Sequence, residues 1–412
     1  MAPVVFISAG EASGEQYGAL LASELCHSLA PKGQRAELIG MGGPRMEAAG
    51  VQCVVRSEDM AVMGFTEVVR HLPRIYREFQ KLKRAIRERR PDVAVLIDFP
   101  EIHFRLARVF HRMGVPVIYF VSPQLWAWKQ HRIRLVRKYV RRMLVIFPFE
   151  EAFYRERGVQ AEFVGHPLAD LAVPAISREQ FAEENGLDAA KTWIGLLPGS
   201  RLPEIEEHLP QMLEAAWGLS APGSSASASP SENYEFVVPL ASTLSAEQQA
   251  VALQLAEEHG GGLPVRLVNN AQATLTHARA SVVASGTATV EAALIGNPFV
   301  VVYRVSPLTY AIARRVVKVP HVAMVNLIAG KRVVPELIQC DFTPANIVQQ
   351  LKRLLPDGPV RESMRMELKA IREALRAHRT NGKGEGLGAI ERVAAIVQIE
   401  AACPSAVQAA QP

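Results

Sequence analysis

Residues 281–304, SVVASGTATVEAALIGNPFVVVYR, carry polar side chains at a spacing that suits the binding of a phosphorylated sugar. An apolar strand is followed by the turn Ser285-Gly286-Thr287 and then by a helix. A helix that starts after a strand presents unpaired N–H groups and a partial positive charge, which favour a phosphate. Gly286 lets a ligand approach the backbone closely, and Glu291, one turn further along, offers two carboxylate oxygens to a sugar diol. The alternative is an ordinary strand–turn–helix whose glutamate faces solvent.

A second set of polar residues follows apolar stretches in the first half of the chain. Asp98 ends the apolar stretch 93–97, where a carboxylate can be partly desolvated and act as a general base. It could instead cap a helix or pair with an arginine. The loop GEASGE, 10–15, precedes a helix and can bring backbone amides to a phosphate, although it lacks the spacing of the known nucleotide loops. Trp126 and Trp128 suit either an apolar ligand or the core.

Short apolar stretches alternate with helical ones and would place these residues at the ends of strands. The alternation predicts right-handed βαβ units and parallel sheets that are covered on both faces. Ligands of such sheets bind beyond the carboxyl ends of the strands. The predicted strands are 4–8, 36–39, 93–97, 115–121, 143–147 and 161–164, then 193–197, 236–238, 265–268, 281–284 and 299–303.

The length of 412 residues predicts two domains, each large enough for its own core. Residues 165–167, Gly-His-Pro, suit the exit from the first domain because proline disfavours a helix at the residue before it. A Ser/Ala-rich stretch, 220–231, is expected to be a flexible surface insertion. The predicted parts are an N-terminal domain (1–167), a C-terminal domain (168–342), helices that can cross back to the first domain (343–400) and a disordered tail (401–412).

The composition is that of a soluble globular protein, with 49% hydrophobic and 21% charged residues. No stretch approaches the roughly 18 apolar residues that span a bilayer. The first residues are expected to form a strand and a glycine turn, not a signal peptide. Cys26, Cys53, Cys340 and Cys403 have no CxxC spacing, so they fit reduced cytosolic thiols better than disulfides or a zinc site.

Residues 70–90 combine an apolar stripe at helical spacing with nine basic and two acidic residues. Seven more basic residues and no acidic one lie in 129–142. A basic amphipathic helix can lie in the headgroup region of an anionic membrane, where each basic residue adds about 1 kcal/mol. The stripe can also pack on a sheet with a solvated basic face. Nucleic-acid binding is the third alternative, and no nucleic-acid motif supports it. The stripe consists of Leu72, Ile75, Tyr76, Phe79, Leu82 and Ile86.

Nine motifs, in order along residues 4–340, together resemble the lipid-A-disaccharide synthase family. Two features depart from the family pattern: Glu15, where the family usually has aspartate, and the insertion at 220–231. The first leaves the role of Glu15 open, and the second is expected to be neutral. The motifs are GEASGE (10–15), GMGGPRMEAAG (40–50), MGFTEV (63–68), IDFPEIH (97–103), SPQLWAWK (122–129), GHPLAD (165–170), LLPGSR (196–201), SGTATVEAAL (285–294) and NLIAG…PELIQ (326–339).

The resemblance implies an α/β glycosyltransferase of the B type, with two Rossmann-like domains whose parallel sheets face each other across a cleft. It implies transfer with inversion from UDP-2,3-diacylglucosamine to 2,3-diacylglucosamine 1-phosphate, giving a β-1,6-linked lipid A disaccharide 1-phosphate and UDP. The UDP-sugar is then a substrate, and neither a cofactor nor a metal is expected, in agreement with the lack of an Asp-x-Asp motif. The alternatives are a UDP-N-acetylglucosamine epimerase and a peptidoglycan glucosaminyltransferase of the same fold.

The same resemblance implies roles for individual residues. Asp98 is the candidate base for the acceptor 6-hydroxyl. Arg201 and the amides of 285–289 are expected to hold the diphosphate, and Glu291 the ribose hydroxyls. The acceptor-side candidates are Glu11, Ser13 and Glu15. The donor-side candidates are Arg201, Ser285, Gly286, Thr287, Thr289 and Glu291, with Asn326, Glu336 and Gln339 in the pocket for the donor sugar.

Because the implied substrates are acylated, the basic amphipathic stretch is expected to contact the membrane. We expect a cytoplasmic protein that attaches peripherally to the anionic inner face of the cytoplasmic membrane and binds no nucleic acid. A dimer is compatible with the sequence, which does not determine the oligomeric state. The side chains expected to contact the membrane or acyl chains are Met63, Phe65, Leu72, Ile75 and Phe79.

Overall fold

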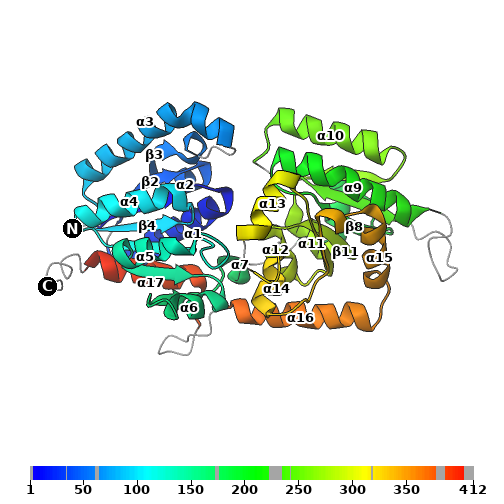
Figure 1. The fold of residues 1–412 in the computed structure, drawn as a ribbon. Coiled ribbons are helices and arrows are strands. Elements are labelled where there is room, and N and C mark those ends of the chain that lie inside the picture. Colours follow the sequence, from blue (N-terminus) through cyan, green and yellow to red (C-terminus); the bar gives the residue numbers. More distant parts are fainter. Residues whose placement is uncertain are drawn as a thin grey trace. The chain divides into compact units, whose positions relative to one another are not determined.

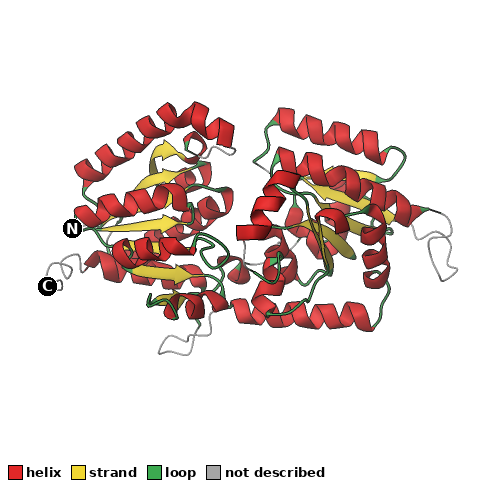
Figure 2. Cartoon of the chain, viewed as in Figure 1, coloured by secondary structure: helices red, strands yellow, loops and turns green. Residues whose placement is uncertain are grey.

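The computed structural model describes residues 3–33, 35–60, 65–171, 176–221, 234–241, 243–316, 319–376 and 386–402. The chain forms two compact units (Figure 1). Unit 1 consists of Met1–Asp170 and Leu375–Pro412, and unit 2 of Leu171–Ala374. Helices and strands alternate throughout both units (Figure 2). Met63, most of the predicted insertion and the end of the predicted tail lie outside the described residues.

Unit 1 is built on seven parallel strands in the order β3-β2-β1-β4-β5-β6-β7. The strands that lie between two neighbours are apolar and almost fully buried, as the apolar stretches predicted. The edge strand β3 was not predicted: its apolar run is only three residues long, and a single one of its five residues, Val55, is buried. The bounds are β1 Val4–Ala9, β2 Glu37–Gly42, β3 Gln52–Arg56, β4 Val93–Ile97, β5 Val117–Phe120, β6 Arg142–Val145 and β7 Ala161–Phe163.

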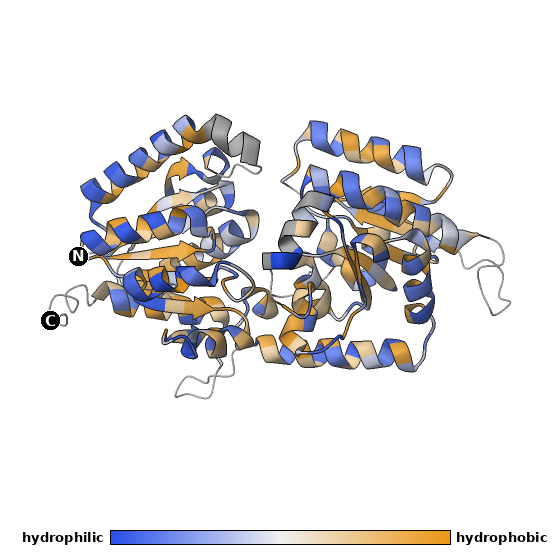
Figure 3. Ribbon diagram, in the orientation of Figure 1, coloured by the Kyte–Doolittle hydropathy of each residue, from blue (hydrophilic) through white to orange (hydrophobic). Residues whose placement is uncertain are grey.

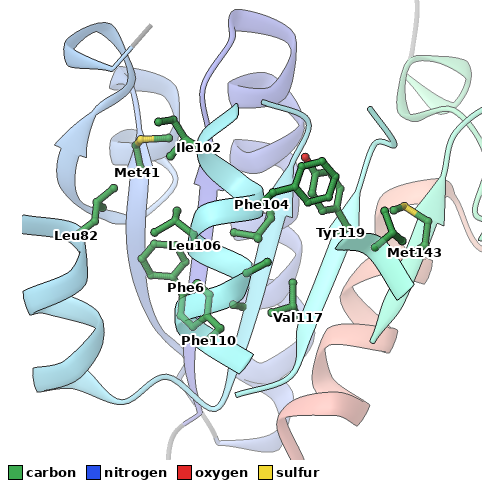
Figure 4. Close-up of a cluster of buried hydrophobic side chains, with 14 of the residues drawn as sticks. Phe6, Met41, Leu82, Ile102, Phe104, Leu106, Phe110, Val117, Tyr119 and Met143 are labelled. Carbon is green, nitrogen blue, oxygen red and sulfur yellow. The ribbon is translucent and has the colours of Figure 1, made fainter. Parts of the chain in front are cut away.

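Helices cover both faces of this sheet. α3, α4 and α5 pack on one face, where Phe6 of β1 meets Phe110 of α4 with 5.0 Å between ring centroids (Figure 4). α1 and α17 pack together on the other face. The bounds are α1 Ala12–Leu29, α2 Pro44–Ala48, α3 Phe65–Arg89, α4 Pro100–Arg112, α5 Ile133–Tyr139, α6 Pro148–Arg155, α7 Pro167–Asp170 and α17 Ala389–Ala402.

The C-terminal helix α17 is an integral part of unit 1. The backbone N–H of Ala389 donates to Asp170 Oδ2 at 2.7 Å. Near the other end of the helix, buried Glu400 accepts from Arg141 at 2.5 Å and from Arg142 at 2.9 Å. A buried carboxylate is stable only when paired, so these contacts fix the position of α17 along the sheet.

Unit 2 is built on six parallel strands in the order β10-β9-β8-β11-β12-β13, which confirms the prediction of two α/β units with parallel sheets. The strands are β8 Thr192–Leu197, β9 Tyr234–Pro239, β10 Val265–Val268, β11 Ala280–Ala284, β12 Phe299–Tyr303 and β13 Glu336–Ile338. The helices are α8 Arg178–Asn185, α9 Leu202–Ser220, α10 Ala246–Gly260, α11 Ala271–His277, α12 Thr287–Ile295, α13 Pro307–Val316, α14 Met324–Ala329, α15 Pro344–Leu354 and α16 Pro359–Leu375.

Each sheet has one point at which the strand order reverses. In unit 1 it lies between β1 and β4, and in unit 2 between β8 and β11. At such a point the connections leave in opposite directions, which opens a crevice outside the carboxyl ends of the strands. The loop 10–15 and Asp98 follow the two strands at this point in unit 1, while 198–201 and 285–287 follow those in unit 2.

Candidate active site

Asp98 follows β4 at the reversal point of unit 1. The register pairs Ile97 with Ala9 and with Phe120, so the loops after β1 and β5 leave the sheet on either side of it. Asp98 and Phe99 both have φ of 49°, in the left-handed region. Such a backbone costs about 1–3 kcal/mol for each non-glycine residue and persists only where the surroundings hold it. The loop that carries the predicted base is therefore strained and fixed.

Three buried side chains hold this turn. The hydroxyl of Tyr119 donates to the Asp98 carbonyl oxygen at 2.6 Å, and His103 Nδ1 donates to the same oxygen at 2.6 Å. Since a carbonyl only accepts, His103 carries its proton on Nδ1, and Nε2 accepts from the Ser8 hydroxyl at 2.8 Å. Burial lowers the pKa of His103 to about 4, so the ring is neutral. These supports were not predicted, because their only signal in the sequence is a histidine five residues after Asp98.

Gly10 makes room for the strained turn. A Cβ atom at this position would lie 2.2 Å from Cγ of the Phe99 ring, closer than two carbon atoms can approach. The ring therefore lies directly against the backbone of the first loop, where only glycine fits. The GEASGE motif thus contributes a packing surface for the Asp98 loop in addition to any contact with a ligand.

The surroundings of the Asp98 carboxyl raise its pKa from 3.8 to about 7. Burial is the largest cause and the negative charge of Glu11 the second, while a hydrogen bond from the Phe99 backbone acts in the opposite direction. A base whose pKa lies near neutral pH combines a useful ionised fraction with strong proton affinity. The sequence suggested a partly desolvated carboxylate here, and the described environment has that property.

The other acceptor-side candidates lie on the first turn of α1. Ser13 is half-buried. Glu15 Oε1 accepts from the backbone N–H of Arg45 at 2.8 Å, and its carboxylate lies against Gly43, where a Cβ would come within 2.5 Å. Glu15 therefore anchors the start of α2 to α1, and its contact with an acceptor stays a prediction.

The loop after β5 contains both tryptophans and is fixed by the buried carboxyl group of Glu150. Trp126 Nε1 donates to Glu150 Oε1 at 3.1 Å, and the Phe147 backbone N–H donates to Glu150 Oε2 at 3.1 Å. Burial raises the pKa of Glu150 to about 8. Trp126 is buried and belongs to the core, whereas Trp128 is exposed, with Lys129 Nζ 4.0 Å from the centre of its ring.

In unit 2, the loop 198–201 binds a carboxylate, which is supplied by Glu204 of the helix that follows the loop. The Ser200 backbone N–H donates to Glu204 Oε2 at 3.0 Å, and Arg201 Nη1 lies 3.1 Å from Glu204 Oε1. Gly199 has φ of 130°, and a Cβ there would lie 2.4 Å from the same carboxylate. A negatively charged group is thus already bound where Arg201 was predicted to meet a diphosphate. The role of Glu204 was not predicted.

The start of α12 leaves its first residues accessible. Gly286 and Thr287 are exposed and Ser285 is half-buried. Thr289 is fully buried, and its hydroxyl donates to the Gly286 carbonyl at 2.7 Å, so this side chain bonds within its own helix. Glu291 is half-buried, and burial raises its pKa. Of the amides predicted to hold a diphosphate, those of Ser285 and Thr289 already donate to the carbonyls of Val302 and Gly286. The contacts of the other first-turn amides and of Glu291 with a ligand stay predictions.

The remaining donor-side candidates lie on α14, at the start of β13 and just after β13. The buried amide of Asn326 donates to Glu336 Oε1 at 2.8 Å and to the Val334 carbonyl at 2.9 Å. Glu336 also accepts from the Ala323 backbone N–H at 3.0 Å, and Gln339 donates to the Val305 carbonyl at 3.1 Å. Asn326 thus fixes Glu336 at the start of α14. The contact of these three side chains with a donor sugar stays a prediction.

The apolar stripe of 70–90 divides into two parts along α3. Leu82 and Ile86 are buried, and Ile75 and Phe79 pack against the core of unit 1. Leu72 and Tyr76 are 51% and 66% exposed. Figure 3 shows hydrophobic and hydrophilic residues mixed along this helix, and the side chain of Phe65 lies outside the described residues. Four of the six side chains therefore lie in or against the core, as one of the alternatives held.

The described residues contain neither a metal-binding cluster nor a membrane-spanning helix. No three histidine, cysteine, aspartate or glutamate side chains within the described ranges are grouped so that they could hold a metal ion. No helix of the described part of the chain is both long and apolar enough to cross a membrane.

The fold is shared with a glycotransferase and with a UDP-GlcNAc 2-epimerase. The glycotransferase of kitacinnamycin is similar with a TM-score of 0.61 at 16% identity, over 97% of this chain and 99% of the other. The UDP-GlcNAc 2-epimerase from Neisseria meningitidis is similar with a TM-score of 0.58 at 11% identity, over 97% of this chain and 100% of the other. At these identities the likeness defines the fold class, that of B-type glycosyltransferases and epimerases.

Similarity in sequence then defines the family. The model of the lipid-A-disaccharide synthetase family matches residues 5–387. The lipid-A-disaccharide synthase of Acidobacterium capsulatum is 57% identical over 383 residues, which cover 91% of this chain and 92% of the relative. The chain therefore belongs to the lipid-A-disaccharide synthetase family, and the resemblance seen in its motifs is confirmed.

Proposed function

We propose that this chain catalyses the synthesis of the lipid A disaccharide by transferring a 2,3-diacylglucosamine residue from UDP to 2,3-diacylglucosamine 1-phosphate. The names of its relatives support this activity. The observation that carries the mechanism is Asp98, a half-buried carboxyl group with a pKa of about 7 on a strained turn at the reversal point of a parallel sheet. No cofactor or metal has a role in the proposed reaction.

The proposed chemistry is a single displacement with inversion. The Asp98 carboxylate takes the proton of the acceptor 6-hydroxyl while that oxygen forms a bond to the anomeric carbon of the donor. The bond between this carbon and the UDP oxygen breaks, and UDP leaves with the electron pair. The free amides at the start of α12 and the guanidinium of Arg201 stabilise the charge that develops on the diphosphate, which is commonly the largest contribution to such catalysis.

Donor recognition follows from the same set of contacts. Glu291 would accept hydrogen bonds from the ribose hydroxyls, and Glu336 and Gln339 would face the sugar. The diphosphate would replace Glu204 as the partner of Arg201 and of the Ser200 amide, because phosphate oxygens match a guanidinium with two parallel hydrogen bonds. The acceptor-side residues lie on unit 1 and the donor-side residues on unit 2, so neither set completes the reaction alone.

An assay of UDP release separates this function from the alternatives. The purified protein is incubated with UDP-2,3-diacylglucosamine, with or without the acylated acceptor, and in parallel with UDP-N-acetylglucosamine. UDP release that requires both acylated substrates supports the proposal. Isomerisation of UDP-N-acetylglucosamine, or UDP release from it, would favour an epimerase or a peptidoglycan glucosaminyltransferase.

We also propose that the protein attaches peripherally to the anionic inner face of the cytoplasmic membrane. The first half of α3 supports this, because it exposes Leu72 and Tyr76 among basic residues. The test measures sedimentation with vesicles that contain phosphatidylglycerol. Leu72→Ser with Tyr76→Ser should weaken binding, whereas Leu253→Ser, at an exposed leucine of unit 2, should not. Equal binding of both variants would refute the attachment through α3.

A further inference from the structure

A groove of about 520 Å³ lies on the surface of unit 1, between the second half of α3, the second half of α4 and α5. Its volume falls within the range of about 300–1,000 Å³ typical of sites for small molecules. None of the residues assigned above to the acceptor or the donor lines it, and Phe79, an expected membrane or acyl-chain contact, does. α4 starts beside Asp98 and runs for 13 residues, about 20 Å, so the basic end of the groove lies away from the transfer site.

The rim of the groove is basic, and none of the described residues that line it is acidic. Arg105, Arg108 and Arg112 follow one another at spacings of three and four residues and therefore share one face of α4. Lys83 and Arg87, four residues apart on α3, line the same groove. Two rows of positive charge thus border a single depression. Such an arrangement is unfavourable unless an anion lies between the rows.

These charges differ from some of the other basic residues of the same region, which have acidic partners. Arg89 pairs with Glu37 at 2.6 Å, and Lys129 pairs with Glu101 at 2.9 Å. Within the described part of the chain, no ion pair involves Lys83, Arg87, Arg105 or Arg112. Arg108 contacts Tyr139, whose hydroxyl accepts from Nε at 3.3 Å.

The positive potential of the basic rim acts on the phenol of Tyr139, which lines the groove. The hydrogen bond from Arg108 lowers the pKa of this phenol, and the charges of Lys138 and Arg112 act in the same direction. The floor, by contrast, is apolar and consists of Phe79, Phe104, Val109, Met113 and Leu135. An anion alone would use the rim and leave the floor in contact with water.

We propose that this groove binds one anionic phospholipid, with the headgroup phosphate between the two basic rows and the first part of an acyl chain on the apolar floor. Guanidinium groups bind phosphate oxygens through paired hydrogen bonds, and the floor supplies the apolar area that an inorganic anion would not use. The site is separate from the transfer site. It does not depend on the proposed reaction, and it differs from the exposed part of α3 around Leu72.

The test measures binding of a soluble short-chain lipid to the full chain by calorimetry. Dihexanoyl phosphatidylglycerol below its micelle concentration is compared with dihexanoyl phosphatidylcholine and with inorganic phosphate. We expect the anionic lipid to bind at one molecule per chain and at least tenfold more tightly than either comparison compound. Equal affinity for phosphatidylcholine, or phosphate binding as tight as that of the anionic lipid, would overturn the proposal.

Variants locate the site. The change Arg105→Gln, Arg108→Gln and Arg112→Gln should weaken binding by about 100-fold, because each basic residue near an anionic lipid contributes about fivefold. The matched control Lys352→Gln, Arg365→Gln and Lys369→Gln removes the same charge from exposed positions of unit 2 and should change binding less than threefold. All these side chains are exposed, so both variants are expected to fold, and unfolding in urea checks this. Equal losses in the two variants would refute the groove as the site.

Discussion

The substitution Asp98→Asn tests both the chemistry and the energetics assigned to this residue. Burial and the charge of Glu11 raise the pKa of Asp98 from 3.8 to about 7. A group whose pKa is raised by folding stabilises the fold while it is protonated, and this stability is lost as the pH rises towards the folded pKa. Between pH 5 and pH 7 the unfolding free energy falls by about 1.4 kcal/mol for each pH unit.

Wild-type protein should therefore lose about 3 kcal/mol of unfolding free energy between pH 5 and pH 8 from this group alone. Asparagine keeps the shape and does not ionise, so the variant should not lose this contribution. Its activity should fall by about 10²- to 10⁴-fold, the usual contribution of a general base. The wild-type rate should rise with pH through about 7, and the variant should show no such rise. The variant should thus be the more stable and the less active protein at pH 8.

Urea unfolding at pH 5 and pH 8 measures the first effect, and UDP release across the same range measures the second. Glu101→Gln is the control, because it changes a carboxyl group of the same motif. Arg132 and Lys129 hold the pKa of Glu101 down at about 2, so this group stays ionised from pH 5 to pH 8. The control should keep the wild-type pH dependence. Wild-type turnover in the Asp98 variant, or parallel stability curves, would refute the reasoning.

Three further substitutions test the surroundings of this residue. Glu11→Gln removes a charge that raises the pKa of Asp98, so the rise in rate should move to lower pH; an unmoved pH profile of UDP release would contradict this. Gly10→Ala places a Cβ 2.2 Å from the Phe99 ring and should reduce kcat at least tenfold with an unchanged circular dichroism spectrum; full activity would show that the turn tolerates displacement. Burial raises the pKa of Glu150 to about 8, so Glu150→Gln should gain stability in urea relative to wild type as the pH rises from 5 to 8; a constant difference would show that the group is ionised throughout.

The ends of the central strands could be predicted from the sequence because burial on both faces leaves a clear signal. β4, β8 and β11 are continuous apolar runs, and the first polar residue after each run marks the carboxyl end. The positions of Asp98 and Ser285 at strand ends follow from this pattern alone. Strand order was needed to show that both lie at a reversal point.

Two of the four edge strands, β3 and β13, and the supports of the site were not predicted. β3 and β13 have half-exposed side chains, which resemble a loop in composition. Ser8 and His103 are 95 residues apart, so their contact has no local signal. Glu204 occupies an ordinary first-turn position of a helix, and only the fold shows that its carboxylate turns back to the Ser200 amide.

The basic amphipathic stretch shows a different limit of sequence reasoning. Helical periodicity predicted that 70–90 has an apolar face, but Leu72 and Phe79 belong to the same stripe and have different surroundings. Leu72 and Tyr76, four residues apart, share the exposed side of the helix, whereas Ile75 and Phe79 pack against the core. Likewise, a count of basic residues cannot show which ones have acidic partners. Arg89 pairs with Glu37, whereas Arg87 has no acidic partner among the described residues, and this difference depends on the position of Glu37 in the fold.

The supports of Asp98 also explain why its titration can be measured without a change of structure. The strained turn is held by Tyr119, His103 and Ser8, and each of these groups keeps its protonation state around neutral pH. Burial lowers the pKa of His103 to about 4 and raises that of Tyr119 well above its usual value. Both side chains donate to the backbone carbonyl of Asp98 and leave its carboxyl group free to ionise. The backbone geometry is therefore the same on both sides of pH 7, so a pH-dependent rate reports the charge of Asp98 and not a rearrangement of its loop.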